Sequence, residues 1–132
     1  MRLRDLHRYL LSIFTLGVVV QFFLAGLGVF KVTGGATDKR FDHVFAPHRA
    51  LGNVLFVVAI LVLLAAMVAR LPRARVALSA AVVVLVFLQS VFANNGPSWF
   101  RAIHVVNAAL ILALTGSFTG MLWREYRTGS AG

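Results

Sequence analysis

Four long apolar runs divide the chain, at residues 10–30, 51–69, 76–93 and 102–123. Each is 18 to 22 residues long, and none contains an aspartate, glutamate, lysine or arginine. About 20 helical residues cross a hydrocarbon layer of about 30 Å, and a chain inside lipid must satisfy its own backbone hydrogen bonds. The pattern predicts an all-α integral membrane protein, an antiparallel four-helix bundle in the lipid bilayer. The first run exceeds the roughly 7–15 apolar residues of a signal peptide, so we keep it as a spanning helix.

Short polar segments join the runs. They favour antiparallel neighbours in one transmembrane domain over residues 1–127, with a disordered tail at 128–132. Gly34–Gly35 predicts a turn in the longest connection. Pro47 suits the first position of the second helix, where a missing N–H costs nothing, and Ser98 suits the N-cap of the fourth.

Composition agrees with this class, because 60% of the 132 residues are hydrophobic and only 13% are charged. A soluble domain of this size has too little interior to bury that much apolar surface. The chain has no cysteine, which excludes disulfides and thiolate ligands.

The net charge of +9 is distributed unequally along the chain. Eight basic residues belong to the side of the two termini, namely Arg2, Arg4, Arg8, Arg70, Arg73, Arg75, Arg124 and Arg127. Five belong to the other side, namely Lys31, Lys39, Arg40, Arg49 and Arg101. The positive-inside rule predicts that both termini lie in the cytoplasm. We expect the protein in the inner membrane of the cell. We interpret the charge as a topology signal with lipid-phosphate contacts and predict no binding to nucleic acid.

The strongly polar residues of the spans share one depth. In this topology Gln21, His48, Gln89, His104 and Asn107 all lie in the outer half of the bilayer. Polar groups in a membrane are costly and usually face an interior or a ligand. A cluster to which all four helices contribute therefore predicts a site.

Two histidines on alternate helices at matching depth are the arrangement that holds a haem iron from both faces. Gly52 and Ala108, four residues after the histidines, leave room for a flat macrocycle, and Gly17, Gln21, Ala25 and Gly28 form a smooth stripe on the first helix. Asn107 is placed to donate a hydrogen bond beside the ligand. The two arginines at the outer rim, Arg49 and Arg101, are placed to pair with haem propionates. We predict one b-type haem with His48 and His104 as metal ligands, and Gln21, Arg49, Gly52, Gln89, Arg101 and Asn107 around it.

The same residues have a structural interpretation. Small residues in membrane helices usually form packing surfaces, and Gln, Asn and His often only hydrogen-bond across helices. The alternative function is a small structural or interaction subunit without a cofactor. A multidrug-type transporter is a weak third hypothesis, because all four acidic residues lie outside the spans. We expect His43 in a solvated loop and His7 at the cytoplasmic interface, and Gly116 to Gly120 ("GSFTG") predicts close helix contact within the bundle or in a homodimer.

Three segments resemble one half of a heme A synthase. "HRALG" at His48 and "IHVVNA" at His104 look like that family's histidine motifs on its second and fourth helices, and "GVFKVTGGATD" is similar to its segment after the first helix. The resemblance implies a four-helix unit with haem-ligating histidines at the outer side. The chain departs from the family because Phe41 to Pro47 contain only Asp42 as a carboxylate where the family has its catalytic glutamate, and the cysteine pair and second half are absent. Heme A synthase activity is therefore not expected, and small four-helix b-type cytochromes are closer in size.

Depth also limits the mechanism. A carrier that moves electrons across a bilayer needs a haem near each face, and the inner half offers only His7. The sequence thus predicts a single outer haem for electron exchange with quinol or a periplasmic partner, for haem handling, or for a structural role. It does not choose among these.

Overall fold

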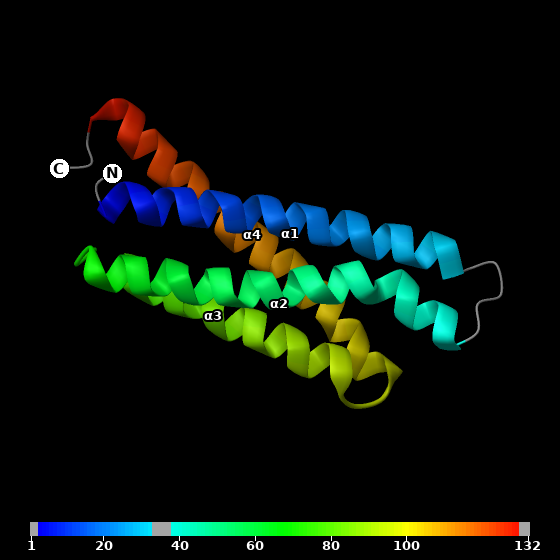
Figure 1. Ribbon diagram of the computed structural model, residues 1–132. Helices are drawn as coiled ribbons and strands as arrows, with labels where there is room; N and C mark the ends of the chain where they lie inside the picture. The colour runs from blue at the N-terminus through cyan, green and yellow to red at the C-terminus, as the bar shows by residue number, and fades with distance from the viewer. Residues whose placement is uncertain (1–2, 33–37, 130–132) are drawn as a thin grey trace.

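The computed structural model describes residues 3–32 and 38–129, and they form four helices without a strand among them (Figure 1). The helices are α1 (Leu3–Val32), α2 (Asp38–Val68), α3 (Arg73–Asn94) and α4 (Ser98–Thr128). The start of α1, the end of α2, the start of α3 and the end of α4 lie at one end of the molecule, which we call the terminal end. The other ends of the four helices lie at the opposite, distal end. The predicted all-α, four-helix fold is confirmed.

All four helices are long and apolar enough to cross a membrane. Large apolar side chains cover the outside of the bundle, for example Ile13, Phe23, Val54, Phe87 and Leu110. A contiguous apolar exterior of this kind is a liability in water and is stable in lipid. The protein is therefore a multi-pass membrane protein, and each helix begins before the apolar run from which it was predicted.

Each helix packs against two neighbours, in the order α1–α2, α2–α3, α3–α4 and α4–α1. The helices α2 and α4 are consequently diagonal to each other. One buried cluster, which includes Phe14, Leu55, Val82 and Ile111, contains side chains from all four helices. A second, with Leu11, Val62 and Phe118, lies nearer the terminal end.

The start of α2 corrects the sequence-based prediction. Pro47 lies inside the helix rather than at its first position, and His43 is an exposed helical residue rather than a loop residue. An internal proline removes one backbone hydrogen bond, and a tertiary contact offsets the loss. Phe45 lies so close to Gly28 of α1 that a Cβ built on the glycine would be 2.5 Å from the ring. This contact stabilises the part of α2 that precedes the apolar run.

Two further boundaries differ from prediction by small amounts. Pro97, not Ser98, occupies the N-cap of α4, and no side chain caps the helix there. Helix α4 includes Thr128, which was predicted in the tail, and ends at Gly129 in the left-handed conformation that favours glycine. The rest of the predicted tail and the predicted turn at Gly34–Gly35 lie outside the described residues.

Candidate functional site

The histidines His48 of α2 and His104 of α4 face each other across the distal half of the bundle. Their ring centroids are 6.3 Å apart, and the ring planes are inclined by 64°. Because α2 and α4 are diagonal, the imidazoles meet inside the bundle rather than on its lipid surface. The two side chains that the sequence places at one depth therefore lie together in space, and we call them the distal histidine pair.

The hydrogen bonds of the pair fix the tautomer of each ring. His48 Nδ1 lies 3.2 Å from the backbone carbonyl oxygen of Gln21. His104 Nδ1 lies 3.0 Å from that of Gln89. A carbonyl oxygen only accepts hydrogen bonds, so Nδ1 is the donor in both rings, and the lone pair of each neutral imidazole is on Nε2. Within residues 3–32 and 38–129 neither Nε2 forms a hydrogen bond. Both rings thus keep a free coordinating nitrogen.

A network of carboxamide groups holds His104 against α3. Gln89 Nε2 donates to the His104 carbonyl at 2.9 Å, and the His104 ring donates back to the Gln89 carbonyl. Asn107, which is only 5% exposed, donates to the Leu85 carbonyl at 2.9 Å and to Gln89 Oε1. The sequence suggested that Asn107 would donate beside a ligand. Here both of its N–H groups are used within the protein, so it acts on His104 only through Gln89.

On the opposite side of the pair, Gly52 makes room for the side chain of Gln21. A Cβ on Gly52 would lie 3.0 Å from Gln21 Nε2. The other amide atom, Gln21 Oε1, is buried and has no hydrogen-bond partner. An unpartnered buried acceptor costs free energy, on the order of 1–3 kcal/mol. It is the one orphaned polar group beside the distal histidine pair among the described residues.

The glycines of the predicted smooth stripe on α1 serve helix packing. A Cβ on Gly17 would lie 2.5 Å from the Leu55 side chain, and Gly28 receives Phe45. Both contacts are with α2. The stripe is therefore the α1–α2 interface at these two positions, as the structural interpretation of small residues predicts, and it does not leave an open face.

The two rim arginines lie in different surroundings. Arg49 donates to the backbone carbonyl of Asp42 at 2.7 Å, and its guanidinium lies 3.5 Å from the Asp42 carboxylate. Arg101 is exposed and forms no ion pair within the part of the chain that the structure describes. Of the two, only Arg101 has an uncommitted charge.

The terminal end contains buried polar side chains that the sequence analysis missed. His7 is only 1% exposed, and its Nε2 lies 3.1 Å from Ser79 Oγ. Since the Ser79 hydroxyl donates to the Arg75 carbonyl, His7 Nε2 must be the donor to Ser79. The sequence analysis expected His7 at the cytoplasmic interface and did not predict that its side chain is buried inside the bundle. The spacing of His7, Leu11, Phe14 and Val18, at helical intervals, carried the signal for one buried face.

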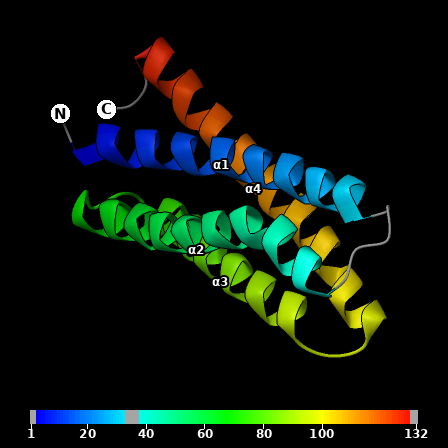
Figure 2. The same ribbon diagram turned by 45° about the vertical axis from the view of Figure 1, so that its right-hand side comes forward.

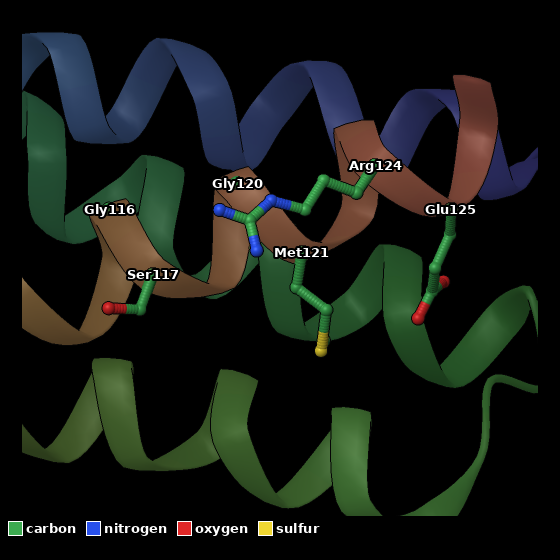
Figure 3. Close-up of a pocket in the computed structure, with 6 residues that line it drawn as sticks. All are labelled: Gly116, Ser117, Gly120, Met121, Arg124 and Glu125. Atoms are coloured by element: carbon green, nitrogen blue, oxygen red, sulfur yellow. The ribbon is translucent and has the colours of Figure 1, made fainter. Parts of the chain in front are cut away.

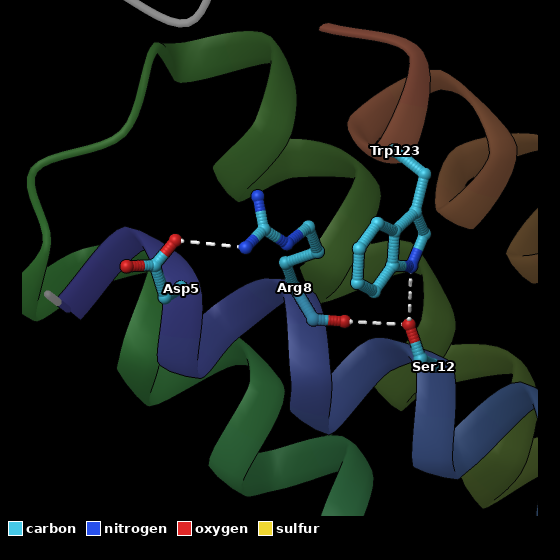
Figure 4. A network of polar contacts seen from close by, with 4 residues as sticks. All are labelled: Asp5, Arg8, Ser12 and Trp123. Carbon is cyan, nitrogen blue, oxygen red and sulfur yellow. Dashed lines mark hydrogen bonds and ion pairs between the residues drawn. The ribbon is translucent and has the colours of Figure 1, made fainter. Parts of the chain in front are cut away.

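Arg8 is the second such residue, and Figure 4 shows its surroundings. Its guanidinium pairs with Asp5 at 2.9 Å and lies over the rings of Tyr126 at 3.7 Å and Trp123 at 4.6 Å. Trp123 Nε1 also donates to Ser12, whose hydroxyl donates to the Arg8 carbonyl. These contacts tie the start of α1 to the end of α4 by cation–π and hydrogen-bonding interactions.

The donor set limits what the distal histidine pair could hold. No group of three or more His, Asp or Glu residues in the described chain is arranged to hold a metal ion. Two neutral imidazoles with free Nε2 atoms suit a metal that brings its remaining ligands with it, as the iron of a porphyrin does. Metal-binding histidines usually donate their other N–H to a carbonyl or carboxylate, as both rings do here. The tautomer of both rings therefore meets the requirement of a haem iron for two neutral imidazoles.

Comparison with known proteins gives a family match. The model of a family described as "Family of unknown function (DUF6220)" matches residues 21–96, which is more than half of the chain and includes Gln21, His48, Gly52 and Gln89. His104 and Asn107 lie outside the matched segment. No curated protein and no solved structure matches the chain.

Proposed function

The chain belongs to the DUF6220 family of unknown function, and we propose that it binds one b-type haem, which His48 and His104 of the distal histidine pair would hold. The observation that carries the proposal is the tautomer of the two rings. Each Nδ1 donates to a main-chain carbonyl of a neighbouring helix, which leaves both Nε2 atoms to coordinate.

The separation of the rings supports the same reading. Two nitrogens that each bind one metal at about 2 Å are at most about 4 Å apart, and their ring centroids are somewhat farther apart than the nitrogens. The observed centroid distance of 6.3 Å is of this size. The distance between the two rings is thus compatible with two imidazoles that bind one metal.

Other residues have defined roles around the ligands. Gln89 and Asn107 hold His104, and the Gln21 carbonyl orients His48. The space beside Gly52 is occupied by the Gln21 side chain. Arg101 has an uncommitted guanidinium for a propionate, whereas Arg49 would first have to leave Asp42. Bound haem would supply reversible one-electron chemistry at its iron.

We place the distal end outside and both termini in the cytoplasm of a bacterial inner membrane. Eight of the 13 basic residues belong to the terminal end, and the positive-inside rule then gives this orientation. The haem would lie near the outer face. His7, the one histidine of the inner half, donates from Nε2 to Ser79, so it does not offer that nitrogen to a second metal. The expected role is electron exchange with quinol or an outer partner, or haem handling, rather than transmembrane electron transfer. The proposal includes the resemblance of the chain to one half of a heme A synthase. It does not include the reaction of that enzyme.

A structural subunit without a cofactor is the second candidate, and one observation favours it. The hydrogen bonds among Gln89, His104 and Asn107 join α3 to α4 with no ligand involved. Polar side chains commonly hold membrane helices in register in this way.

Substitution of single histidines separates the two candidates. We expect His48→Ala or His104→Ala, expressed with ample haem, to abolish the low-spin absorption spectrum or convert it to a five-coordinate, high-spin one. The matched control is His43→Ala, which removes an exposed histidine from the same helix as His48 and should leave the spectrum unchanged. Equal spectra for all three variants would contradict the proposed ligands.

A further inference from the structure

A shallow cavity lies on the outside of α4 near the terminal end, far from the distal histidine pair. Its volume is about 400 Å³, and its lining consists of Gly116, Ser117, Gly120, Met121, Arg124 and Glu125 (Figure 3). We call it the α4 groove. All of its lining residues belong to α4, and Ser117, Met121 and Glu125 point toward the side of the neighbouring helix α3 (Figure 3).

The bundle itself does not fill the groove. A Cβ built on Gly116 or Gly120 would meet nothing within 4 Å, whereas Gly17 and Gly28 on α1 receive side chains from α2. In both ribbon views the last turns of α4 stand apart from α3 (Figures 1 and 2). The side chains of Arg75 and Glu125, which form an ion pair, bridge the two helices there. The two glycines of the "GSFTG" segment therefore do not make the close contact within the bundle that their size allows. The segment touches the bundle on its other face, where Phe118 is buried and Thr119 Oγ1 lies 3.0 Å from Thr15 Oγ1.

The charge of the groove is positive. The Arg124 side chain extends back along the helix, and its guanidinium lies beside Gly120 (Figure 3). Arg124 forms no ion pair within residues 3–32 and 38–129. The Glu125 carboxylate is already neutralised by Arg75. An arginine on a spanning helix is costly unless an anion or water meets it.

The aromatic residues nearby locate this charge at the membrane surface. Tyr9, Trp123 and Tyr126 meet at the terminal end, and such rings are enriched at the headgroup level. Arg124 is in the same turn as Trp123. Gly116 is eight residues deeper, about 12 Å at 1.5 Å per residue. The groove thus extends from the headgroup level into the hydrocarbon layer.

We propose that the α4 groove binds an anionic phospholipid, with an acyl chain along Gly116 and Gly120 and the phosphate at Arg124. Basic pockets at helix surfaces near the membrane interface recognise anionic headgroups in this way. A second copy of the chain fits less well. A two-fold dimer about an axis normal to the membrane, joined through these glycines, would bring each Arg124 close to its own symmetry mate, and the two like charges would repel. This inference is independent of haem binding.

The test compares spin-labelled phosphatidylglycerol with spin-labelled phosphatidylcholine at the protein reconstituted in phosphatidylcholine vesicles. We expect the wild type to prefer the anionic lipid and Arg124→Gln to lower that preference roughly fivefold, the effect of about one interfacial charge. The matched control is Arg127→Gln, an exposed arginine of the same helix end that is not part of the groove lining, and it should cause a clearly smaller loss. Gly120→Leu should reduce the motionally restricted component of both lipids without disturbing the fold, since its Cβ points into open space.

Two results would overturn the proposal. Equal losses for Arg124→Gln and Arg127→Gln would mean that the preference reflects diffuse surface charge. Efficient disulfide cross-linking of Ser117→Cys in vesicles, in a chain that has no other cysteine, would mean that a second copy covers the groove.

Discussion

Replacing Asn107 by leucine tests whether the carboxamide network stabilises the bundle. Both N–H groups of its side chain donate, one to the Leu85 carbonyl and one to Gln89 Oε1. Asn107→Leu is close in size, so it removes both hydrogen bonds and also leaves Gln89 Oε1 without this donor. Interhelical hydrogen bonds in membranes contribute about 0.6 kcal/mol on average and up to about 1.7 kcal/mol. We expect the free energy of unfolding to fall by about 1–2 kcal/mol.

The measurement is reversible unfolding in mixed micelles of dodecyl maltoside and sodium dodecyl sulfate, followed by circular dichroism. The matched control is Asn53→Leu. Asn53 is also in the distal half, but it is exposed on the outside of α2, so its replacement should cost no stability. A double-mutant cycle with Gln89→Leu should give a coupling free energy of at least about 0.5 kcal/mol, because the two side chains share a bond. If Asn107→Leu is as stable as Asn53→Leu, the network does not hold α4 to α3.

Two further predictions concern helix packing and orientation. Gly28→Ala should lower the free energy of unfolding by about 1–3 kcal/mol, because its methyl group would overlap the Phe45 ring. The control Gly26→Ala, whose added methyl group meets nothing within 4 Å, should leave the free energy of unfolding unchanged or raise it by up to about 1 kcal/mol. Equal effects of the two substitutions in thermal unfolding would refute the Phe45 contact. In intact cells, a membrane-impermeant thiol reagent should label Asn95→Cys and not Arg73→Cys, and labelling of Arg73→Cys from outside would reverse the proposed orientation.

The parts of the fold that the sequence predicted depend on the membrane, which constrains a chain in simple ways. Charge-free runs of about 20 residues are enough to count the helices, because lipid allows few other structures. Depth along the helix also follows from residue number, which is why His48 and His104 could be expected at one level. The distance of 6.3 Å between their ring centroids agrees with that expectation.

The parts that failed depend on tertiary contacts and on the rotation of each helix about its axis. Nothing local to Pro47 indicates that the helix continues through it, since the compensating contact is between Phe45 and Gly28 of another helix. Similarly, the glycines of α1 predicted a smooth stripe, but they did not indicate which side chains of α2 would fill it. The burial of the His7 side chain could have been predicted, because its helical spacing with Leu11 and Phe14 was available in the sequence.

Haem content of the purified wild-type protein tests the central proposal most directly. The chain would be expressed with ample haem, purified in mild detergent, and measured by absorption in the oxidised and dithionite-reduced states, with haem quantified as its pyridine adduct. The proposal predicts one haem per chain and a low-spin, six-coordinate spectrum in both states, as two imidazole ligands require. A folded protein that shows no Soret band under these conditions would contradict it and leave the structural-subunit function.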